Sequence, residues 1–259
     1  MGYTNSPLVN YTKISPNRTK NRNHKIDTIT IHCVVGQCSV ETIGNVFAPK
    51  SRRASSNYGI GPDGRIGMYC EEKDRSWCSS SSSNDNRAIT IEVASNTKEP
   101  YAVTDKAYKS LINLVADICK RNGIKELKWK GDESLVGQVD KQNMTVHRWF
   151  ANKSCPGSYL YNHMGDIAKQ VNAKLGKTTT VATKPTTSST SFKAYRVRVT
   201  ADVLRIRKGA GTNYATAGFI RNHGVYTIVS ESKGKGSTKG WGKLKSGAGW
   251  ISLDYVKKV

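Results

Sequence analysis

Three short apolar runs share one ending, and this pattern constrains the fold more than any other feature of the chain. The runs end Thr-Ile-His at residues 30–32, Thr-Ile-Glu at residues 90–92 and Thr-Val-His at residues 145–147. Side chains alternate between the two faces of a strand, so each Thr shares a face with the ionisable residue two positions later. The apolar residue between them points to the other face. If the three strands are neighbours, two imidazoles and one carboxylate collect on one face of a sheet.

The stretch after the third run adds two further polar side chains, Lys153 and Cys155. Taken singly, His32, His147 and Cys155 would each more often be a packed residue than a ligand. Together, two His and one Cys can bind a zinc ion and leave its fourth position open, which is the arrangement of a catalytic zinc site. The combination predicts a zinc-dependent hydrolase.

The pattern around these runs predicts an α/β domain over residues 1–176, with a mixed sheet flanked by helices. The polar residues 1–25 are interpreted as an extended arm. The predicted elements are a strand at 26–35, a helix that Ser39 caps and Pro49 ends, a hairpin at 55–70, and helices at 104–122 and 158–175. The five Ser at 79–83 are interpreted as a solvated connector in preference to a flexible rim over a substrate groove.

Composition changes sharply after the last predicted helix. Residues 177–193 are dominated by Thr, Ser, Lys and Pro and are predicted to be an interdomain linker. Short alternating runs with Gly turns then predict a small all-β domain of barrel type over residues 194–259. From Phe192 onward there are 14 Lys and Arg against 3 acidic residues, a net charge of +11, which is half of the formal +22 of the whole chain.

The charge and the cysteines of the chain indicate what kind of partner it binds and in which compartment it is held. The excess of positive charge implies a polyanionic partner, which can be nucleic acid, an anionic membrane surface or an anionic cell wall. The six Cys form neither a small-domain disulfide framework nor a CxxC pair, which favours reduced thiols. Residues 1–25 contain no apolar signal-peptide core, and no run is long enough to span a membrane. These features predict a protein made and held in the cytoplasm.

Four stretches, TITIHCV, ASSNYGIGPDGRI, NDNRAITIEVASN and VHRWFANKSCPG, make the first domain resemble the type-2 N-acetylmuramoyl-L-alanine amidases. That family includes phage enzymes and is related to peptidoglycan recognition proteins. The likeness covers roughly residues 10–175, and VHRWFANKSCPG is its most specific stretch because it repeats the family's His, Lys and Cys spacing. The resemblance implies that His32, His147 and Cys155 are Zn²⁺ ligands, that Glu92 is the base, and that Lys153 is the basic residue beside the metal.

The implied reaction is hydrolysis of the amide between N-acetylmuramic acid and the L-alanine of the stem peptide. Zinc lowers the pKa of a bound water from ~16 to ~7. A neighbouring carboxylate can take the proton of that water and pass it to the leaving amine, and a fixed ammonium can stabilise the oxyanion. The implied biological role is that of a phage or prophage endolysin, which accumulates in the cytoplasm and reaches the wall after the membrane is breached.

Two positions depart from the family pattern. Ser56 stands where several relatives carry a Tyr, and Cys78 stands where relatives often carry a His. Tyr58 is interpreted as a packed strand aromatic and not as a substitute for the missing Tyr, while Asn57 is predicted to contact the substrate.

The second domain resembles a bacterial SH3 domain through LRIRKGAGTNY and GWGKLKSGAGWISLDYV. That family usually anchors enzymes to the cell wall, which implies peptidoglycan as a partner. The charge of +11 from Phe192 onward suggests anionic wall polymers as further partners. Trp241, Trp250 and Tyr255 are the candidate wall-binding residues, and packing within a small β-barrel is the alternative for each of them.

Other functions stay open at this point. A non-catalytic peptidoglycan-recognition protein has usually lost a zinc ligand, whereas this chain keeps all three candidates. A cell-wall cysteine peptidase places its nucleophile upstream of its His, and only His163 and His223 follow Cys155. A nucleic-acid binder fits the charge, but no zinc-finger spacing or RNA-binding motif supports it. A host autolysin fits the chemistry but normally needs export.

Overall fold

A computed structural model describes residues 2–176, 192 and 194–259 of the chain. The chain divides into two compact units, Met1–Ala182 and Thr183–Val259, which are considered one at a time. The predicted linker at 177–193 lies, apart from Phe192, outside the described residues. No helix in the described part of the chain is long and apolar enough to cross a membrane.

Unit 1 is built on a six-stranded mixed sheet with the strand order β1-β5-β4-β7-β3-β8. Its strands are β1 (Tyr11–Thr12), β3 (Thr28–Cys33), β4 (Tyr58–Ile60), β5 (Ile66–Met68), β7 (Ala88–Val93) and β8 (Met144–Val146). The strands β7, β3 and β8 are parallel neighbours, which is the condition under which their shared endings collect on one face. The strands β4 and β5 form the predicted antiparallel hairpin. The predicted mixed sheet with flanking helices is confirmed for this unit.

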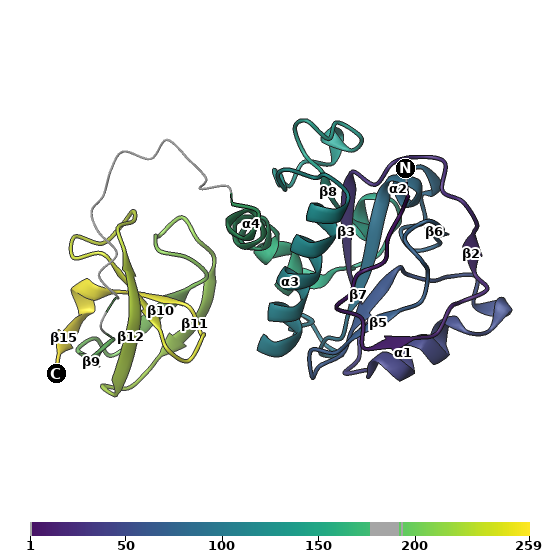
Figure 1. Cartoon of the computed structure of the whole chain (residues 1–259). Coiled ribbons are helices and arrows are strands. Elements are labelled where there is room, and N and C mark those ends of the chain that lie inside the picture. The colour runs from purple at the N-terminus through teal and green to yellow at the C-terminus, as the bar shows by residue number, and fades with distance from the viewer. Residues whose placement is uncertain (1, 177–191, 193) are drawn as a thin grey trace. The chain divides into compact units, whose positions relative to one another are not determined.

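The helices of unit 1 begin and end largely where local signals indicate. They are α1 (Val40–Phe47), α2 (Ser82–Arg87), α3 (Asp105–Arg121) and α4 (Gly157–Lys174). Ser39 caps α1 by accepting from the N–H of Thr42, and Thr104 caps α3 by accepting from the N–H of Ala107. Gly123, with a φ of +69°, follows the end of α3 in the left-handed region that glycine adopts without strain. The two long helices α3 and α4 pack against each other on one side of the sheet (Figure 1).

One face of β3, β7 and β8 is apolar and packs against these two helices. Ile31, Ile91 and Val146 are fully buried in the same cluster as Leu111 of α3 and Leu160 of α4. Burying an aliphatic side chain of this kind contributes about 1.5–3 kcal/mol to folding. The apolar residue in each run ending therefore fixes the orientation of its strand, and the Thr, His and Glu side chains must occupy the opposite face.

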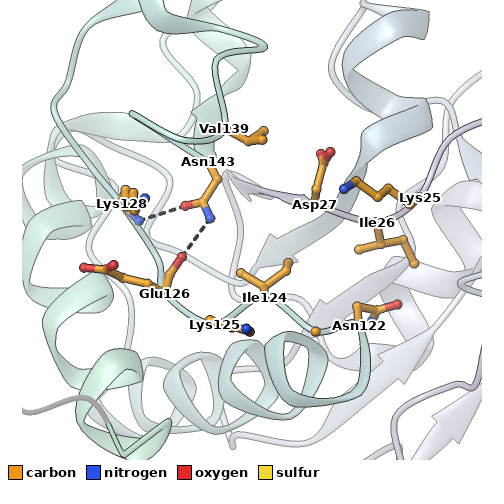
Figure 2. Close-up of a pocket in the computed structure, with 11 residues that line it drawn as sticks. Lys25, Ile26, Asp27, Asn122, Ile124, Lys125, Glu126, Lys128, Val139 and Asn143 are labelled. Carbon is orange, nitrogen blue, oxygen red and sulfur yellow. Dashed lines mark hydrogen bonds between the residues drawn. The ribbon is translucent and has the colours of Figure 1, made fainter.

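A hollow of about 380 Å³ lies at the amino ends of β3 and β8 (Figure 2). Asn143, just before β8, accepts from the N–H of Lys128 at 2.7 Å and donates to the carbonyl of Glu126 at 2.8 Å. Asp27, just before β3, forms an ion pair with Arg87 at 2.8 Å. The buried polar side chains around this hollow are thus engaged in holding the loops that meet there.

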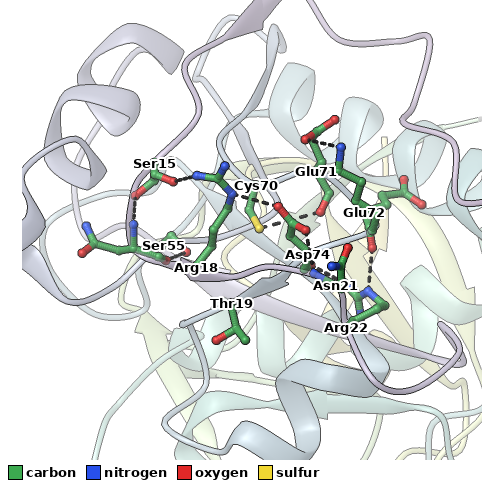
Figure 3. A network of polar contacts seen from close by, with 12 residues as sticks. Ser15, Arg18, Thr19, Asn21, Arg22, Ser55, Cys70, Glu71, Glu72 and Asp74 are labelled. Atoms are coloured by element: carbon green, nitrogen blue, oxygen red, sulfur yellow. Dashed lines mark hydrogen bonds and ion pairs between the residues drawn. The ribbon is translucent and has the colours of Figure 1, made fainter.

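The N-terminal arm is fastened to unit 1 along its length. Strand β1 pairs with β5, and β2 (Arg18–Thr19) pairs with β6 (Arg75–Ser76). Figure 3 shows the polar contacts that accompany this pairing: the buried guanidinium of Arg22 donates to the main-chain carbonyls of Glu72 at 2.6 Å and Asp74 at 3.0 Å. The sequence predicts only an extended lead-in, whereas the buried cation makes the arm part of the packed unit.

Unit 2 is all β, as predicted. Its seven-stranded sheet has the order β11-β10-β14-β13-β12-β9-β15. The strands are β9 (Tyr195–Val199), β10 (Leu204–Arg207), β11 (Thr216–Ile220), β12 (Val225–Ser232), β13 (Trp241–Leu244), β14 (Trp250–Ser252) and β15 (Val256–Lys258). Alternate residues of β9 and β10, such as Val197, Val199, Leu204 and Ile206, are buried in one apolar cluster, so the period of two in the sequence specifies its core.

Candidate active site

The carboxyl ends of β3, β7 and β8 bring the three run endings together. His32 lies opposite Glu92 in the parallel ladder of β3 and β7. On the other side of β3, strand β8 ends at Val146, so His147 opens a 3-10 turn instead of closing the strand. The rings of His32 and His147 meet edge to face with their centroids 5.1 Å apart. The juxtaposition that side-chain alternation predicts is present in the structure.

Cys155 completes a cluster of metal-binding atoms with the two histidines. It lies in the turn before α4, and its Sγ is 3.5 Å from Nδ1 of His32. The ligand atoms of His32, His147 and Cys155 all lie within 4.8 Å of one another. In a tetrahedral zinc site with bonds of about 2.0–2.3 Å, the donor atoms are about 3.3–3.8 Å apart. A small contraction of this cluster therefore matches the geometry of a zinc site.

Apart from the contact of Nδ1 with Cys155, the His32 ring makes no hydrogen bond among the described residues. The ring is fully buried, its Nε2 has no hydrogen-bond partner among the described residues, and its Nδ1 faces the sulfur of Cys155. Burial, with a smaller contribution from His147, lowers the pKa of His32 to about 3, so the imidazole is neutral at physiological pH. Metal coordination requires that neutral form. The types of donor and the neutral form of His32 therefore fit zinc.

Glu92 supplies the carboxylate of the site, and Cys78 lies beside it. Within the described part of the chain, Oε2 of Glu92 is buried without a hydrogen-bond partner, and Oε1 is 4.0 Å from Sγ of Cys78. Burial raises the pKa of Glu92 to about 7, the range that suits a group that both takes and returns a proton. His32, Cys78 and Glu92 form a second group whose ligand atoms lie within 4.8 Å. The sequence marks Cys78 only as a departure from a family pattern, and the structure brings it to the site.

Lys153 is exposed in the turn between His147 and Cys155. Its N–H donates to the carbonyl of Ala151 at 2.7 Å, which fixes the backbone of the turn. Burial is the main cause that lowers the pKa of His147, and the positive charge of Lys153 is the next. The ammonium group thus acts electrostatically on a residue of the cluster while it stays in contact with solvent.

The serine run is a built part of the site, and its interpretation as a solvated connector is wrong. Helix α2 begins within the run at Ser82, and Ser81 is its N-cap. Ser79 is fully buried. Its hydroxyl accepts from the side-chain amide of Asn84 at 3.1 Å. The run therefore forms a tight loop and the start of α2, and the buried amide of Asn84 holds this loop in place.

Asn84 connects this loop to two of the three run endings. Its Nδ2 donates to Oγ1 of Thr30 at 3.0 Å, and its Oδ1 accepts from Oγ1 of Thr145 at 3.0 Å. The two threonine hydroxyls are themselves 2.7 Å apart. The threonines that precede the two histidines on the same face thus anchor the loop that lies beside them.

Ser80 contacts the second histidine directly. Its Oγ lies 3.1 Å from Nε2 of His147, and its φ of +65° is in the left-handed region that residues other than glycine rarely adopt. Asp85 holds the loop in this shape by accepting from the N–H groups of Cys78 at 2.9 Å and Ser79 at 3.1 Å. With Nε2 bonded to Ser80, Nδ1 is the nitrogen of His147 left for coordination. Ser80 carries no local sequence signal, because only the fold brings it to a histidine 67 positions away.

Two residues of the predicted hairpin do not reach the site. Asn57 is fully buried; its Oδ1 accepts from the N–H of Thr90 at 3.2 Å, and its Nδ2 donates to the main-chain carbonyls of residues 70 and 71. The structure therefore gives Asn57 a role in holding β7, in place of the predicted substrate contact. Ser56 is buried as well and donates to the carbonyl of Tyr58, which is itself a fully buried strand aromatic, as predicted.

The candidate wall-binding residues of unit 2 differ in their surroundings. Trp241 is 3% exposed and Tyr255 is 52% exposed, and both line a hollow of about 480 Å³. Trp250 is half-buried on β14 and does not line that hollow. The three residues therefore do not form one continuous aromatic surface.

A family match assigns the chemistry of this site. The chain belongs to the Amidase_2 family, N-acetylmuramoyl-L-alanine amidase, whose sequence profile matches residues 22–158, more than half of the chain. The protein is accordingly a peptidoglycan amidase, which hydrolyses the bond between N-acetylmuramic acid and L-alanine. The matched residues include His32, Glu92, His147, Lys153 and Cys155.

Solved structures similar to this chain share low sequence identity with it. The endolysin N-acetylmuramoyl-L-alanine amidase LysCS from Clostridium intestinale URNW is 20% identical, with 68% of this chain and 99% of that chain covered and a TM-score of 0.43. A selenomethionine derivative of AmpD is 17% identical, with 65% and 99% covered and a TM-score of 0.46. A mutant endolysin from Bacillus subtilis is 17% identical, with 65% and 100% covered and a TM-score of 0.43. No curated protein matches the chain.

Proposed function

We propose that this amidase is zinc-dependent, with His32, His147 and Cys155 as the metal ligands, Glu92 as the general base and Lys153 as the group that stabilises the oxyanion. The observation that carries the proposal is the buried His32 ring. Its Nε2 has no partner in the described part of the chain, and its Nδ1 lies 3.5 Å from the Cys155 sulfur. A buried polar group is normally satisfied, so an imidazole in this state is best explained as a ligand.

Each residue around the ligands has a separate role in amide hydrolysis. When bound, zinc supplies Lewis-acid chemistry that makes hydroxide available near neutral pH. Glu92 shares a sheet face with His32, takes the proton of the attacking water and returns it to the leaving amine of L-alanine. The exposed ammonium of Lys153 offers positive charge to the carbonyl oxygen as it becomes an oxyanion. Ser80 orients the imidazole of His147 through its Nε2.

The test compares the full-length wild type with Cys155→Ala and, as a matched control, Cys38→Ala, which removes a half-buried thiol outside the cluster. Zinc content is measured first. Each protein is then incubated with purified cell walls, and new L-alanine amino termini and reducing sugars are assayed separately. We expect about one zinc per chain, with L-alanine termini released by the wild type and by Cys38→Ala, but not by Cys155→Ala. Release that persists in the metal-free protein would overturn zinc dependence and point to a cysteine peptidase.

We propose further that unit 2 is an SH3-like module that holds the enzyme on the wall. Support comes from the net charge of +11 from Phe192 onward and from the exposed aromatic residue at its hollow, Tyr255. A tethered wall-binding module raises the effective concentration of the catalytic unit at its substrate. Deleting residues 194–259 is expected to lower activity on whole walls while cleavage of a soluble muramyl peptide is retained.

The role of a phage or prophage endolysin, stored in the cytoplasm until lysis, stays a prediction. It is tested by expressing the chain in a susceptible bacterium and permeabilising the membrane at a chosen time. A stored endolysin stays in the soluble fraction and lyses the cells only after permeabilisation. An exported host autolysin would release L-alanine termini from the wall without that treatment.

A further inference from the structure

The hollow of unit 2 combines features that its proposed wall-binding role alone does not explain. Three of the exposed large apolar side chains of the chain, Val203, Phe219 and Tyr255, meet there at its rim. They are 51%, 45% and 52% exposed, whereas unpaired apolar surface of this kind is usually scattered singly. The hollow, of about 480 Å³, has the size of a small-ligand site.

The charge of the hollow is positive and uncompensated by its own walls. Arg205 and Arg207 of β10 line it, and no acidic residue does so among the described residues. Of the two acidic residues nearest in sequence, Asp202 lies 3.1 Å from Nε2 of His223. Asp254 accepts from the N–H of Lys239 at 2.8 Å and from the hydroxyl of Ser252, which lines the hollow, at 3.2 Å. An anion that enters the hollow therefore meets two arginines of its wall, of which Arg207 also donates to the carbonyl of Tyr214 at 2.8 Å.

Trp241, which lines the hollow, has an indole N–H without an acceptor among the described residues. Trp241 is 3% exposed, and its Nε1 is buried with no hydrogen-bond partner in the described part of the chain. Indole N–H groups in protein interiors normally find an acceptor. At the rim, the guanidinium of Arg205 lies over the ring of Phe219 at 5.7 Å from its centroid, so the cation is held at the mouth of the hollow and does not extend freely into solvent.

We infer that this hollow is a binding site for the phosphodiester groups of an anionic wall polymer. The inference deepens the proposed wall-binding role of unit 2 and rests on it. Planar guanidinium groups bind phosphate oxygens with two parallel hydrogen bonds, and the apolar rim accommodates the carbon chain or sugar between phosphates. The other basic residues of the unit favour a ligand that carries many negative charges over a single stem-peptide carboxylate, because a polymer engages the hollow and the surrounding surface together.

The test uses the full-length chain and two matched pairs of variants. Arg205→Gln and Arg196→Gln each remove one exposed strand arginine of unit 2, but only Arg205 lines the hollow. Phe219→Ala and Phe192→Ala each remove an exposed Phe, 45% and 43% exposed, and only Phe219 lines the hollow. Binding to purified walls is measured by co-sedimentation in a Glu92→Gln background, which keeps the walls intact. Two further measurements complete the test. One uses the same walls after acid has removed their phosphodiester polymers, and the other adds a soluble poly(glycerol phosphate) as a competitor.

We expect Arg205→Gln and Phe219→Ala to weaken binding to intact walls on the order of tenfold, and the two controls to change it by less than about twofold. Stripping the walls should abolish the difference within each pair, and the soluble polymer should compete only against chains with an intact hollow. Equal losses for Arg205→Gln and Arg196→Gln would show that only overall charge matters. Undiminished differences on stripped walls would assign the hollow to peptidoglycan itself. Either result overturns the inference.

Cleavage of a soluble muramyl peptide by the same variants, without the Glu92 substitution, separates this inference from the proposed catalytic mechanism. The four variants should match the wild type in that assay, because all four substitutions lie outside the catalytic unit. If none of the chains cleaved the peptide, the proposed catalytic mechanism would be wrong, while the wall-binding result would still hold.

Discussion

The two ends of the sheet in unit 1 differ in how their buried polar groups are satisfied. At the carboxyl end, Nε2 of His32 and Oε2 of Glu92 have no hydrogen-bond partner among the described residues. At the amino end, Asp27 and Asn143 are also buried, but their side chains are fully engaged with neighbouring loops. The hollow of Figure 2 lies at the amino end. A hollow is therefore a poor marker of the site, and unsatisfied buried atoms, which cost about 1–3 kcal/mol each, are a better one.

The largest effect on activity should come from removing the carboxylate at the carboxyl end of the sheet. We expect Glu92→Gln to lower the rate of L-alanine release on the order of 100- to 10,000-fold, because an amide cannot take the proton of the attacking water. Zinc content should stay unchanged, since Glu92 is not among the three proposed ligands. The readout is kcat on a soluble muramyl peptide, with bound zinc measured on the same sample.

Asp27→Asn is the counterpart at the amino end. It breaks the pairing with Arg87, so the free energy of unfolding should fall by about 1–3 kcal/mol while kcat stays within about twofold of the wild type. If both variants lowered kcat alike, the two ends would not differ in function and the comparison would fail.

The difference between the ends also shows what sequence can predict. The alternation in Thr-Ile-His, Thr-Ile-Glu and Thr-Val-His is local, so the strand face that His32, Glu92 and His147 occupy follows from residues two positions apart. That the three strands are neighbours is set by the fold. Ser80 and Asn84 gave no local signal, because their partners lie 67 and 61 positions away. Asn57 was misjudged for the same reason: its amide bonds to Thr90, 33 positions on, which only the pairing of strands brings close.

The next largest effects come from replacing two buried asparagines. The pair distinguishes a loss of fold stability from a loss of zinc binding. Both are 5% exposed and satisfied: Asn84 bonds to Thr30, Thr145 and Ser79, and Asn143 bonds to loop backbone at the opposite end. Removing either amide leaves buried groups unpaired. We therefore expect Asn84→Ala and Asn143→Ala each to lower the free energy of unfolding of the metal-free protein by about 2–3 kcal/mol in denaturant titrations.

Only Asn84→Ala should also weaken zinc binding, on the order of tenfold or more, because the loop that Asn84 holds carries Ser80 to His147. Zinc affinity is measured by competition with a chromogenic chelator. A loss of affinity in Asn143→Ala as large as in Asn84→Ala would mean that general loosening of the fold, and not the position of the loop, controls the site.

The smallest effect tests a single hydrogen bond. Ser80→Ala removes the hydroxyl 3.1 Å from Nε2 of His147, so the imidazole loses the contact that fixes its orientation. We expect zinc affinity to fall about tenfold, which is the lower end for loss of a residue that supports a metal ligand, since Ser80 is exposed and water can replace part of the bond. Ser83→Ala, in the same run but bonded only to Ser81 in the described structure, is the control and should bind zinc as the wild type does. Because Ser80 sits at a φ of +65°, Ser80→Gly should relieve the backbone strain and yet lose the same zinc affinity, so an affinity restored by Gly would show that the backbone of the loop, and not the hydroxyl, holds His147 in place.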